Sequence, residues 1–127
     1  MTETKIDISR ASKAIRDSRF VEALSMLESN LAKDPDHLES LYFAAVCSRY
    51  LKNYKDSQKY LENLLTKAPD MGRAYQELGH LSKAIGNDEN AASHYRQACE
   101  LNPALISSWK SLFCLLYTSP SPRDLRK

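Results

Sequence analysis

Three prolines divide most of this chain into segments of equal length. Pro35, Pro69 and Pro103 are separated by two gaps of 34 residues each. Internal repeats of this length are typical of a two-helix unit that buries its apolar face against the next copy. Such a period constrains the fold strongly, because each position must then suit the same place in every copy.

Small and large side chains also recur at fixed distances before each proline. Small residues come twelve positions earlier and large ones eight positions earlier, as Ala23, Ser57, Ala91 and Leu27, Leu61, Tyr95. Small side chains allow two helices to approach closely, and large ones a turn further on fill the remaining space. Glycine and proline are scarce, with 3 and 5 residues, which favours helix. We expect an all-α chain with helices over 5–17, 20–33, 37–52, 55–67, 71–85, 88–101 and 105–113.

The third repeat has the clearest internal pattern. It reads Tyr75-x2-Leu78-Gly79-x2-Ser82, then Ala91-x3-Tyr95, then Pro103. This resembles the tetratricopeptide repeat family, whose pattern is Trp-x2-Leu-Gly-x2-Tyr, then Ala-x3-Phe, then Pro. The resemblance covers residues 4–112, with repeats at 4–37, 38–71 and 72–105 and a partial repeat at 106–113. It implies a right-handed helical solenoid of antiparallel helix pairs, which we treat as one domain over residues 1–113.

Short polar segments predict the turns inside the repeats. Gly86-Asn87 can end a helix because both residues tolerate a left-handed backbone, and Asp17-Ser18 and Lys52-Asn53 occupy the corresponding positions. Each proline is expected in the first turn of the following helix, where its missing N–H would be unpaired anyway. Gly79 is expected where a side chain would clash with the neighbouring helix. The same register predicts a core of Leu24, Leu27, Leu41, Ala45, Leu61, Leu64, Leu78, Gly79, Ala91, Tyr95 and Ala98.

The last residues differ in character from the repeats. Residues 114–124, CLLYTSPSPRD, resemble one reading frame of the transposase adapter used to prepare shotgun sequencing libraries. We therefore expect residues 114–127 to be a non-native, extended tail, and the alternative is an ordinary tail. Of the 18 basic and 16 acidic residues, this tail holds three and one, which leaves 15 of each. A neutral body lacks the cationic surface that nucleic-acid binding requires, so we expect no such partner.

Catalytic and metal-binding patterns are absent from the sequence. His37, His80 and His94 show no His-x3-His spacing, and no Gly-rich phosphate loop or serine elbow occurs. We expect no metal, no cofactor and no enzymatic activity. Three well-separated cysteines favour a cytoplasmic location over a disulfide framework, and we expect Cys47 and Cys99 to be core thiols. No run of about 18 apolar residues occurs, so we expect no membrane span.

The family resemblance implies that the first helix of each repeat lines a concave groove. The implied groove positions hold six basic residues and one acidic residue, Glu39, together with tyrosines. Arginine suits carboxylates and tyrosine provides rigid contact area, so an acidic peptide is the expected partner. The alternative is that solvated helix faces simply collect Lys and Arg. The candidate partner-binding residues are Lys5, Arg16, Tyr42, Arg49, Tyr50, Arg73, Gln76, His80, Lys83 and Lys110.

Two hypotheses for function follow. The first is a protein-interaction module that binds a peptide or partner domain. The family's carboxylate clamp for chaperone tails needs Lys and Asn where this chain has Ile8 and Ser12, so we expect no co-chaperone role. In the second, residues 72–112 resemble the repeat arm of bacterial sulfotransferases, and the chain is a truncated arm without its catalytic domain. The partial fourth repeat, with Trp109 and Leu112, predicts an uncapped apolar end and self-association.

Overall fold

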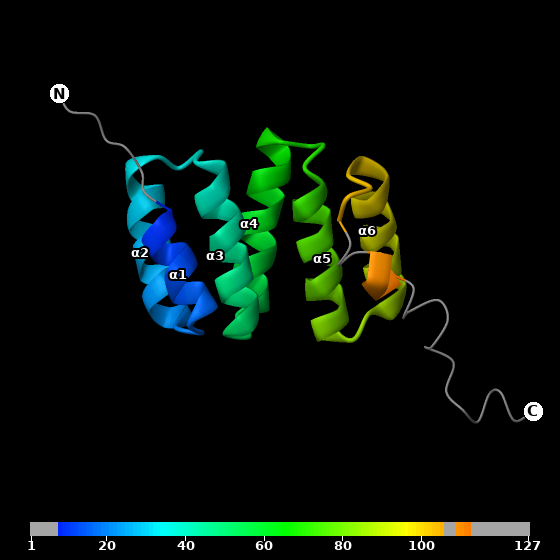
Figure 1. Ribbon diagram of the computed structural model, residues 1–127, viewed down its shortest axis with the longest axis horizontal. Coiled ribbons are helices and arrows are strands. Elements are labelled where there is room, and N and C mark those ends of the chain that lie inside the picture. Colours follow the sequence, from blue (N-terminus) through cyan, green and yellow to red (C-terminus); the bar gives the residue numbers. More distant parts are fainter. Residues whose placement is uncertain (1–7, 106–108, 113–127) are drawn as a thin grey trace, which may run out of the picture. The chain divides into compact units, whose positions relative to one another are not determined.

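The computed structural model describes residues 8–105 and 109–112, and these residues contain helices and turns but no strand. The helices are α1 (Ser9–Arg16), α2 (Phe20–Lys33), α3 (Leu38–Tyr50), α4 (Tyr54–Lys67), α5 (Gly72–Ile85) and α6 (Asp88–Leu101) (Figure 1). Residues 109–112 form a further helical turn. The all-α prediction is confirmed. The candidate residue Lys5 and the predicted tail at 114–127 lie outside the described residues.

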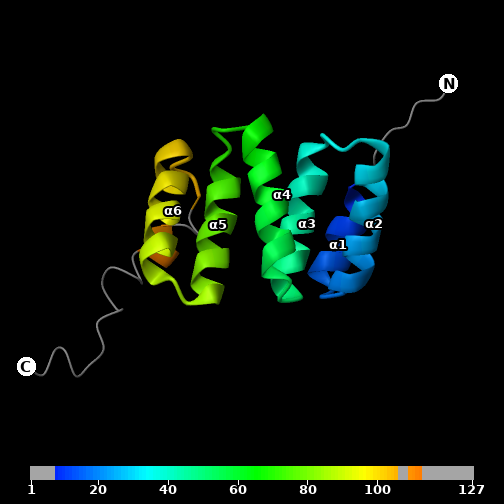
Figure 2. The ribbon, with the colours of Figure 1, turned by 180° about the vertical axis from the view of Figure 1, so that it is seen from behind.

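The chain divides into two compact units, which we call the N-terminal unit (residues 1–69, with α1–α4) and the C-terminal unit (residues 70–127, with α5, α6 and the turn at 109–112). Within each unit, consecutive helices pack side by side and run in opposite directions (Figures 1 and 2). None of the described helices is long and apolar enough to cross a membrane. The predicted helix pairs are therefore present in both units.

The turns inside the repeats share one backbone geometry. Ser18, Lys52 and Gly86, which are spaced by the repeat period, all have a positive φ, of 62°, 66° and 98°. In each turn the N–H of the next residue bonds to a carbonyl five residues back in the helix, as Asn53 N donates to Ser48 O over 2.8 Å. This pattern satisfies carbonyls that the helix end leaves unpaired. The predicted turns are confirmed.

The prolines lie in the turns between repeats, and not in the first helical turn as predicted. Pro35 and Pro69 come three residues before the first residues of α3 and α5. The residue before a proline is driven out of the helical region, so Asp34 and Ala68 cap the preceding helices with an extended backbone (φ −143° and −136°). Proline then opens the turn, and His37 caps α3 through a bond from the Ser40 N–H to its ring Nδ1.

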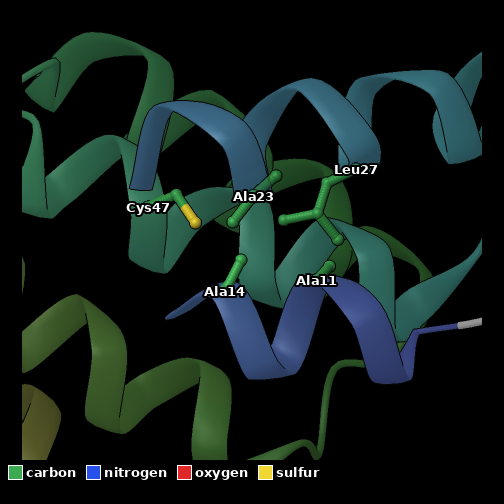
Figure 3. Packing of buried hydrophobic residues seen from close by; sticks show 6 residues of the cluster. Ala11, Ala14, Ala23, Leu27 and Cys47 are labelled. Carbon is green, nitrogen blue, oxygen red and sulfur yellow. The ribbon is translucent and has the colours of Figure 1, made fainter. Parts of the chain in front are cut away.

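The core of the N-terminal unit is built from small residues around one large one. Ala11 and Ala14 of α1 face Ala23 and Leu27 of α2 and Cys47 of α3 (Figure 3), and each is at most 1% exposed. Small side chains at the crossing allow the three helices to approach closely. In α4 the small residue of the repeat is Ser57, which is polar. Its hydroxyl has a hydrogen-bond partner, because the Oγ donates to the carbonyl oxygen of Ala45 over 2.9 Å.

The core of the C-terminal unit depends on one close approach between α5 and α6. A Cβ atom on Gly79 would lie 2.5 Å from a ring carbon of Tyr95, which is completely buried. The prediction that a side chain at Gly79 would clash is confirmed. The predicted core residues are buried except for Leu24 and Leu78, which are half-buried.

Candidate functional site

In the N-terminal unit, the described candidate residues gather toward one end. Arg16 is the last residue of α1 and is exposed, and its Nη1 lies 3.5 Å from the Oγ of Ser12 one turn earlier. Arg49 and Tyr50 end α3. Because α1 and α3 contribute to one core cluster and both run toward this end (Figure 1), the three side chains belong to the same edge of the unit. Tyr42, two turns earlier in α3, packs edge-to-face on Phe43.

Two side chains contact the ring of Tyr50. The ring of Phe20 stacks on it with a centroid separation of 4.5 Å and an angle of 5° between the ring planes. The guanidinium carbon of Arg49 lies 4.5 Å from the centroid of Tyr50. Such stacked and cation–π contacts restrict the side chains before any partner arrives.

Phe20 did not appear among the predicted site residues. The prediction followed only the first helix of each repeat, whereas Phe20 begins the second helix, α2. The sequence does indicate its position, because Phe20 is a large aromatic residue directly after the tight turn at Ser18. Such a residue must lie close to the end of α1. Val46, which lies between the candidates Tyr42 and Arg49 on α3, is 9% exposed and contributes mainly to packing.

Charges at the α1–α2 turn are largely compensated except at Arg16. Arg19 lies 3.4 Å from Asp17 Oδ2 and 3.2 Å from Glu22 Oε1, so one guanidinium binds both carboxylates. At the α3–α4 turn, an open hollow is lined by Lys52, Asn53, Tyr54, Lys55 and Asp56, and it was not predicted. The edge therefore carries more positive than negative charge close to Tyr50.

In the C-terminal unit, the candidates form a set of their own on α5. Arg73, Gln76, His80 and Lys83 follow each other at three- and four-residue steps, which places them on one face of the helix. Arg73 and Lys83 are exposed, while Gln76 and His80 are half-buried. Lys110 is exposed on the helical turn at 109–112.

His80 is joined to the core by a hydrogen bond that the sequence did not predict. Its ring Nδ1 lies 2.7 Å from the hydroxyl oxygen of Tyr95, and the two rings pack edge-to-face with centroids 5.3 Å apart. The buried tyrosine thus fixes the orientation of a side chain on the candidate face. Glu77 was also missed: it lies on α5 and is 2% exposed, whereas exposed positions are usual for glutamate.

Burial shifts the pKa values of His94 and Cys99. Burial lowers the pKa of His94, and a hydrogen bond with Gln97 acts in the opposite direction. Burial raises the pKa of Cys99, which disfavours the reactive thiolate. Cys47 and Cys99 are both buried, so the predicted core thiols are confirmed. Across residues 8–105 and 109–112, no group of three His, Cys, Asp or Glu side chains is arranged to hold a metal ion.

Known structures share this helical arrangement. The first TPR domain of human RPAP3 superposes with a TM-score of 0.81 at 17% identity, over 92% of each chain. An O-GlcNAc transferase mutant of Thermobaculum terrenum reaches 0.82 at 23% identity, over 91% of this chain and 23% of that protein. The first TPR of Spaghetti (RPAP3), bound to an HSP90 peptide, reaches 0.78 at 18% identity, over 89% and 90%. Identities this low establish the fold alone.

Sequence comparison gives the family. A TPR repeat-containing protein of Rhizobium etli is 28% identical over 94 residues, which make up 74% of this chain and 46% of the relative. The chain therefore spans about half the length of that curated relative. Two sequence models described as tetratricopeptide repeat match residues 14–78 and 72–105, and the first alone covers half of the chain. Together with the helix pairs and their common turns, these matches show that the chain belongs to the tetratricopeptide repeat family.

Proposed function

We propose that this chain is a protein-interaction module that binds an acidic peptide or a partner domain through the faces of its first helices. Two structural relatives support the general use of the fold, since the first TPR of Spaghetti is bound to the HSP90 peptide SRMEEVD. The second TPR domain of human RPAP3 is in complex with the HSP70 peptide SGPTIEEVD. Both peptides carry consecutive glutamates near an acidic end.

The observation that carries the proposal is the basic and aromatic character of the two candidate faces. Arg73 and Lys83 extend from one face of α5, Arg16 ends α1, and Arg49 precedes Tyr50 at the end of α3. Arginine forms paired hydrogen bonds with carboxylates, and tyrosine offers contact area at low entropic cost. Partner binding through such faces needs no catalytic residue, and we propose no enzymatic activity for the chain itself.

The partner is proposed to differ from a chaperone tail. The family's clamp for such tails uses an amine and an amide on the first helix, and this chain has Ile8 and Ser12 at those positions. Both side chains are half-buried, and Ile8 packs against the core of the N-terminal unit. An apolar side chain there offers no donor for a terminal carboxylate.

Peptide binding tests the proposal directly. We expect the chain to bind acidic peptides more tightly than neutral or basic ones in a fluorescence anisotropy panel. The double variant Arg49→Glu, Arg73→Glu should weaken this binding by about tenfold, equivalent to about 1.4 kcal/mol, and flatten its salt dependence. Arg10→Glu with Arg96→Glu is the matched control, because both arginines are exposed and outside the candidate set. A panel in which no class of peptide binds would contradict the function.

A second proposal concerns the longer protein from which the chain could derive. The resemblance of residues 72–112 to the repeat arm of bacterial sulfotransferases supports it. Reading the gene past Phe113 tests it: a strand followed by a phosphate-binding loop would establish a catalytic domain, and further repeats alone would reject one.

Self-association through the C-terminal end also remains a prediction. Trp109 and Leu101 are 48% and 43% exposed. Sedimentation velocity at increasing concentration measures association, and Trp109→Lys should reduce it. A strictly monomeric chain would contradict this prediction.

A further inference from the structure

One edge of the N-terminal unit combines an exposed aromatic ring with a fixed geometry. Here α1 and α3 end and α2 begins, so the three helix ends lie together (Figures 1 and 2). Tyr50 remains 52% exposed although its ring stacks on Phe20 and lies under the guanidinium of Arg49. The exposed part of the ring is therefore held in place by contacts with two side chains.

The support beneath Tyr50 is part of the fold. Phe20 packs against the core cluster formed by α1, α2 and α3, so its ring cannot move without disturbing that core. The nearly parallel rings then hold Tyr50 in one orientation. A side chain that is already ordered loses little conformational entropy when a partner binds, which makes it a good anchor.

The edge that carries this ring has positive charge, since the guanidinium carbon of Arg49 lies 4.5 Å from the centroid of Tyr50. Arg16 occupies the same repeat position as Tyr50, at the end of the neighbouring first helix, and it is exposed. Its polar contact is a long one to Ser12, whereas the nearby carboxylates of Asp17 and Glu22 are held by Arg19. An anionic partner therefore meets Arg16 without competition from these two carboxylates.

We propose that Tyr50, supported by Phe20 and with Arg16 at the same edge, is the anchor subsite of the N-terminal unit for an acidic peptide. Phe20 covers one face of the Tyr50 ring and the Arg49 guanidinium covers the other, so the subsite takes an apolar side chain against the exposed edge of the ring and a neighbouring carboxylate on Arg16. Phe20 acts as a positioning residue, because it holds the tyrosine without meeting the peptide. The proposal rests on the proposed function and adds the sequence requirement: acidic residues on both sides of an apolar one.

Two labelled peptides test the subsite on the full chain by fluorescence anisotropy. One is Glu-Asp-Glu-Phe-Glu-Asp-Glu, and the other has serine in place of the central phenylalanine. We expect the phenylalanine peptide to bind about tenfold more tightly, as expected for an aromatic side chain at a binding hot spot. Tyr50→Ala should abolish this preference, and Tyr50→Phe should retain it because the stacked ring remains.

The charge requirement has a matched control on the same helix. Arg16→Glu should weaken the binding of both peptides by about fivefold and flatten the salt dependence of that binding, since the charge of one cation close to the peptide is reversed. Arg10→Glu makes the same charge change on an exposed residue about 120° away around α1, at about 100° per residue, and should leave affinity within about twofold. Equal effects of the two substitutions would show a general charge effect and would overturn the role of Arg16.

The positioning role of Phe20 needs a readout that stability alone does not change. Phe20→Leu keeps an apolar contact with the core but removes the stacked ring. We expect it to reduce the preference for the phenylalanine peptide while binding of the serine peptide stays within about twofold, because a leucine cannot hold the tyrosine flat. Equal losses for both peptides would assign Phe20 a purely structural role.

The outcomes separate this proposal from the general function. If acidic peptides bind but Tyr50→Ala leaves the preference unchanged, the subsite is wrong and peptide binding stands. If only basic or neutral peptides bind, the subsite is wrong and the interaction function stands. If a ten-nucleotide oligothymidine binds more tightly than the phenylalanine peptide, the edge recognises nucleic acid and the proposal is overturned. Circular dichroism of each variant checks that the helices are retained.

Discussion

The N-terminal and C-terminal units have different pairs of buried residues at the same two positions of the repeat. Repeat two has Ala45 and Leu61 at the positions where repeat three has Gly79 and Tyr95, and Gly79 faces the ring of Tyr95. All four residues are buried. A larger side chain on the second helix is thus accompanied by a smaller one on the first. The repeat constrains the combined volume of the pair, because interiors are close-packed and tolerate neither a void nor an overlap.

Tyrosine in place of leucine also changes which hydrogen bonds the pair can form. Tyrosine has a hydroxyl group that leucine lacks, and in the C-terminal unit this hydroxyl reaches His80 on the candidate face. The N-terminal unit has no equivalent bond, because Leu61 is apolar. There, a candidate side chain is ordered from outside the core, by the stacking of Phe20 on Tyr50. Two repeats of one family therefore order their candidate side chains by different contacts.

Removing the large residue tests the volume argument most severely. Leu61→Ala should lower the free energy of unfolding by about 2–5 kcal/mol, because it leaves a cavity in a fully buried site. Chemical denaturation measures the change. Leu65→Ala, one turn away at a half-buried position, is the control and should cost less. A loss below about 1 kcal/mol for Leu61→Ala would show that the pair does not determine the packing.

Converting one pair into the other tests whether the two residues compensate. Gly79→Ala should cost about 1–3 kcal/mol, because its Cβ atom would overlap the Tyr95 ring and force it to shift. Adding Tyr95→Leu recreates the pair of repeat two and should recover part of the loss, measured as non-additivity in a double-mutant cycle. If the two substitutions change the free energy of unfolding additively, the two residues do not compensate for each other in volume.

The turns offer a second contrast between the units. Gly86 adopts the left-handed conformation without a Cβ atom, whereas Lys52 adopts it with one. We expect Lys52→Gly to stabilise the N-terminal unit by about 0.5–1 kcal/mol and Gly86→Ala to destabilise the chain by about 1 kcal/mol, since the strain is about 1–2 kcal/mol per residue. Lys55→Gly, inside the first turn of α4, should instead destabilise. Thermal melting measures all three.

The pH dependence should differ between equivalent positions. His94 and Tyr60 occupy the same place in repeats three and two, and burial lowers the pKa of His94 but raises that of Tyr60. The His94 contribution is complete above the unfolded pKa of about 6.5 and is lost as the pH falls toward the lower folded pKa. The Tyr60 contribution is complete below about 10 and is lost as the pH rises through the raised folded pKa.

Urea unfolding between pH 7.5 and 5.5 measures the His94 effect, which we expect to be the smallest of the set. His94→Tyr recreates the residue of repeat two and should reduce the loss of stability on acidification. If acidification destabilises the wild type and His94→Tyr equally, burial of His94 does not cause the effect.

Much of the fold was predictable because each structurally important position recurs in three repeats of the sequence. The recurrence of Ala23, Ser57 and Ala91 predicted the close helix crossings, and the aligned turn positions predicted the left-handed residues. The prolines were placed wrongly, because a missing N–H is tolerated both in a first helical turn and in the turn before it. The geometry of Asp34 resolves this choice, since the residue before proline leaves the helix and ends it there.

The candidate site was predicted less completely than the fold. Spacing identifies which residues share a helix face, so Arg73, Gln76 and His80 could be grouped from the sequence. It does not state which residue of another helix reaches that face. Phe20 and Tyr95 order candidate side chains from second helices, and their contacts cross between helices that are joined only by tertiary packing. Glu77 was missed for the same reason, because its burial depends on what surrounds α5.

The sequence by itself determined the period, the helix pairs, the small and large core positions and the turns, because these depend on local backbone preference and on side-chain volume repeated every 34 residues. The tertiary structure alone decided which pair of residues shares the core volume, and which side chains meet across helices. Those contacts depend on distances between helices, and a spacing of residues along one helix carries no information about them. The stacking of Phe20 on Tyr50 therefore becomes visible only when α2 and α3 lie side by side.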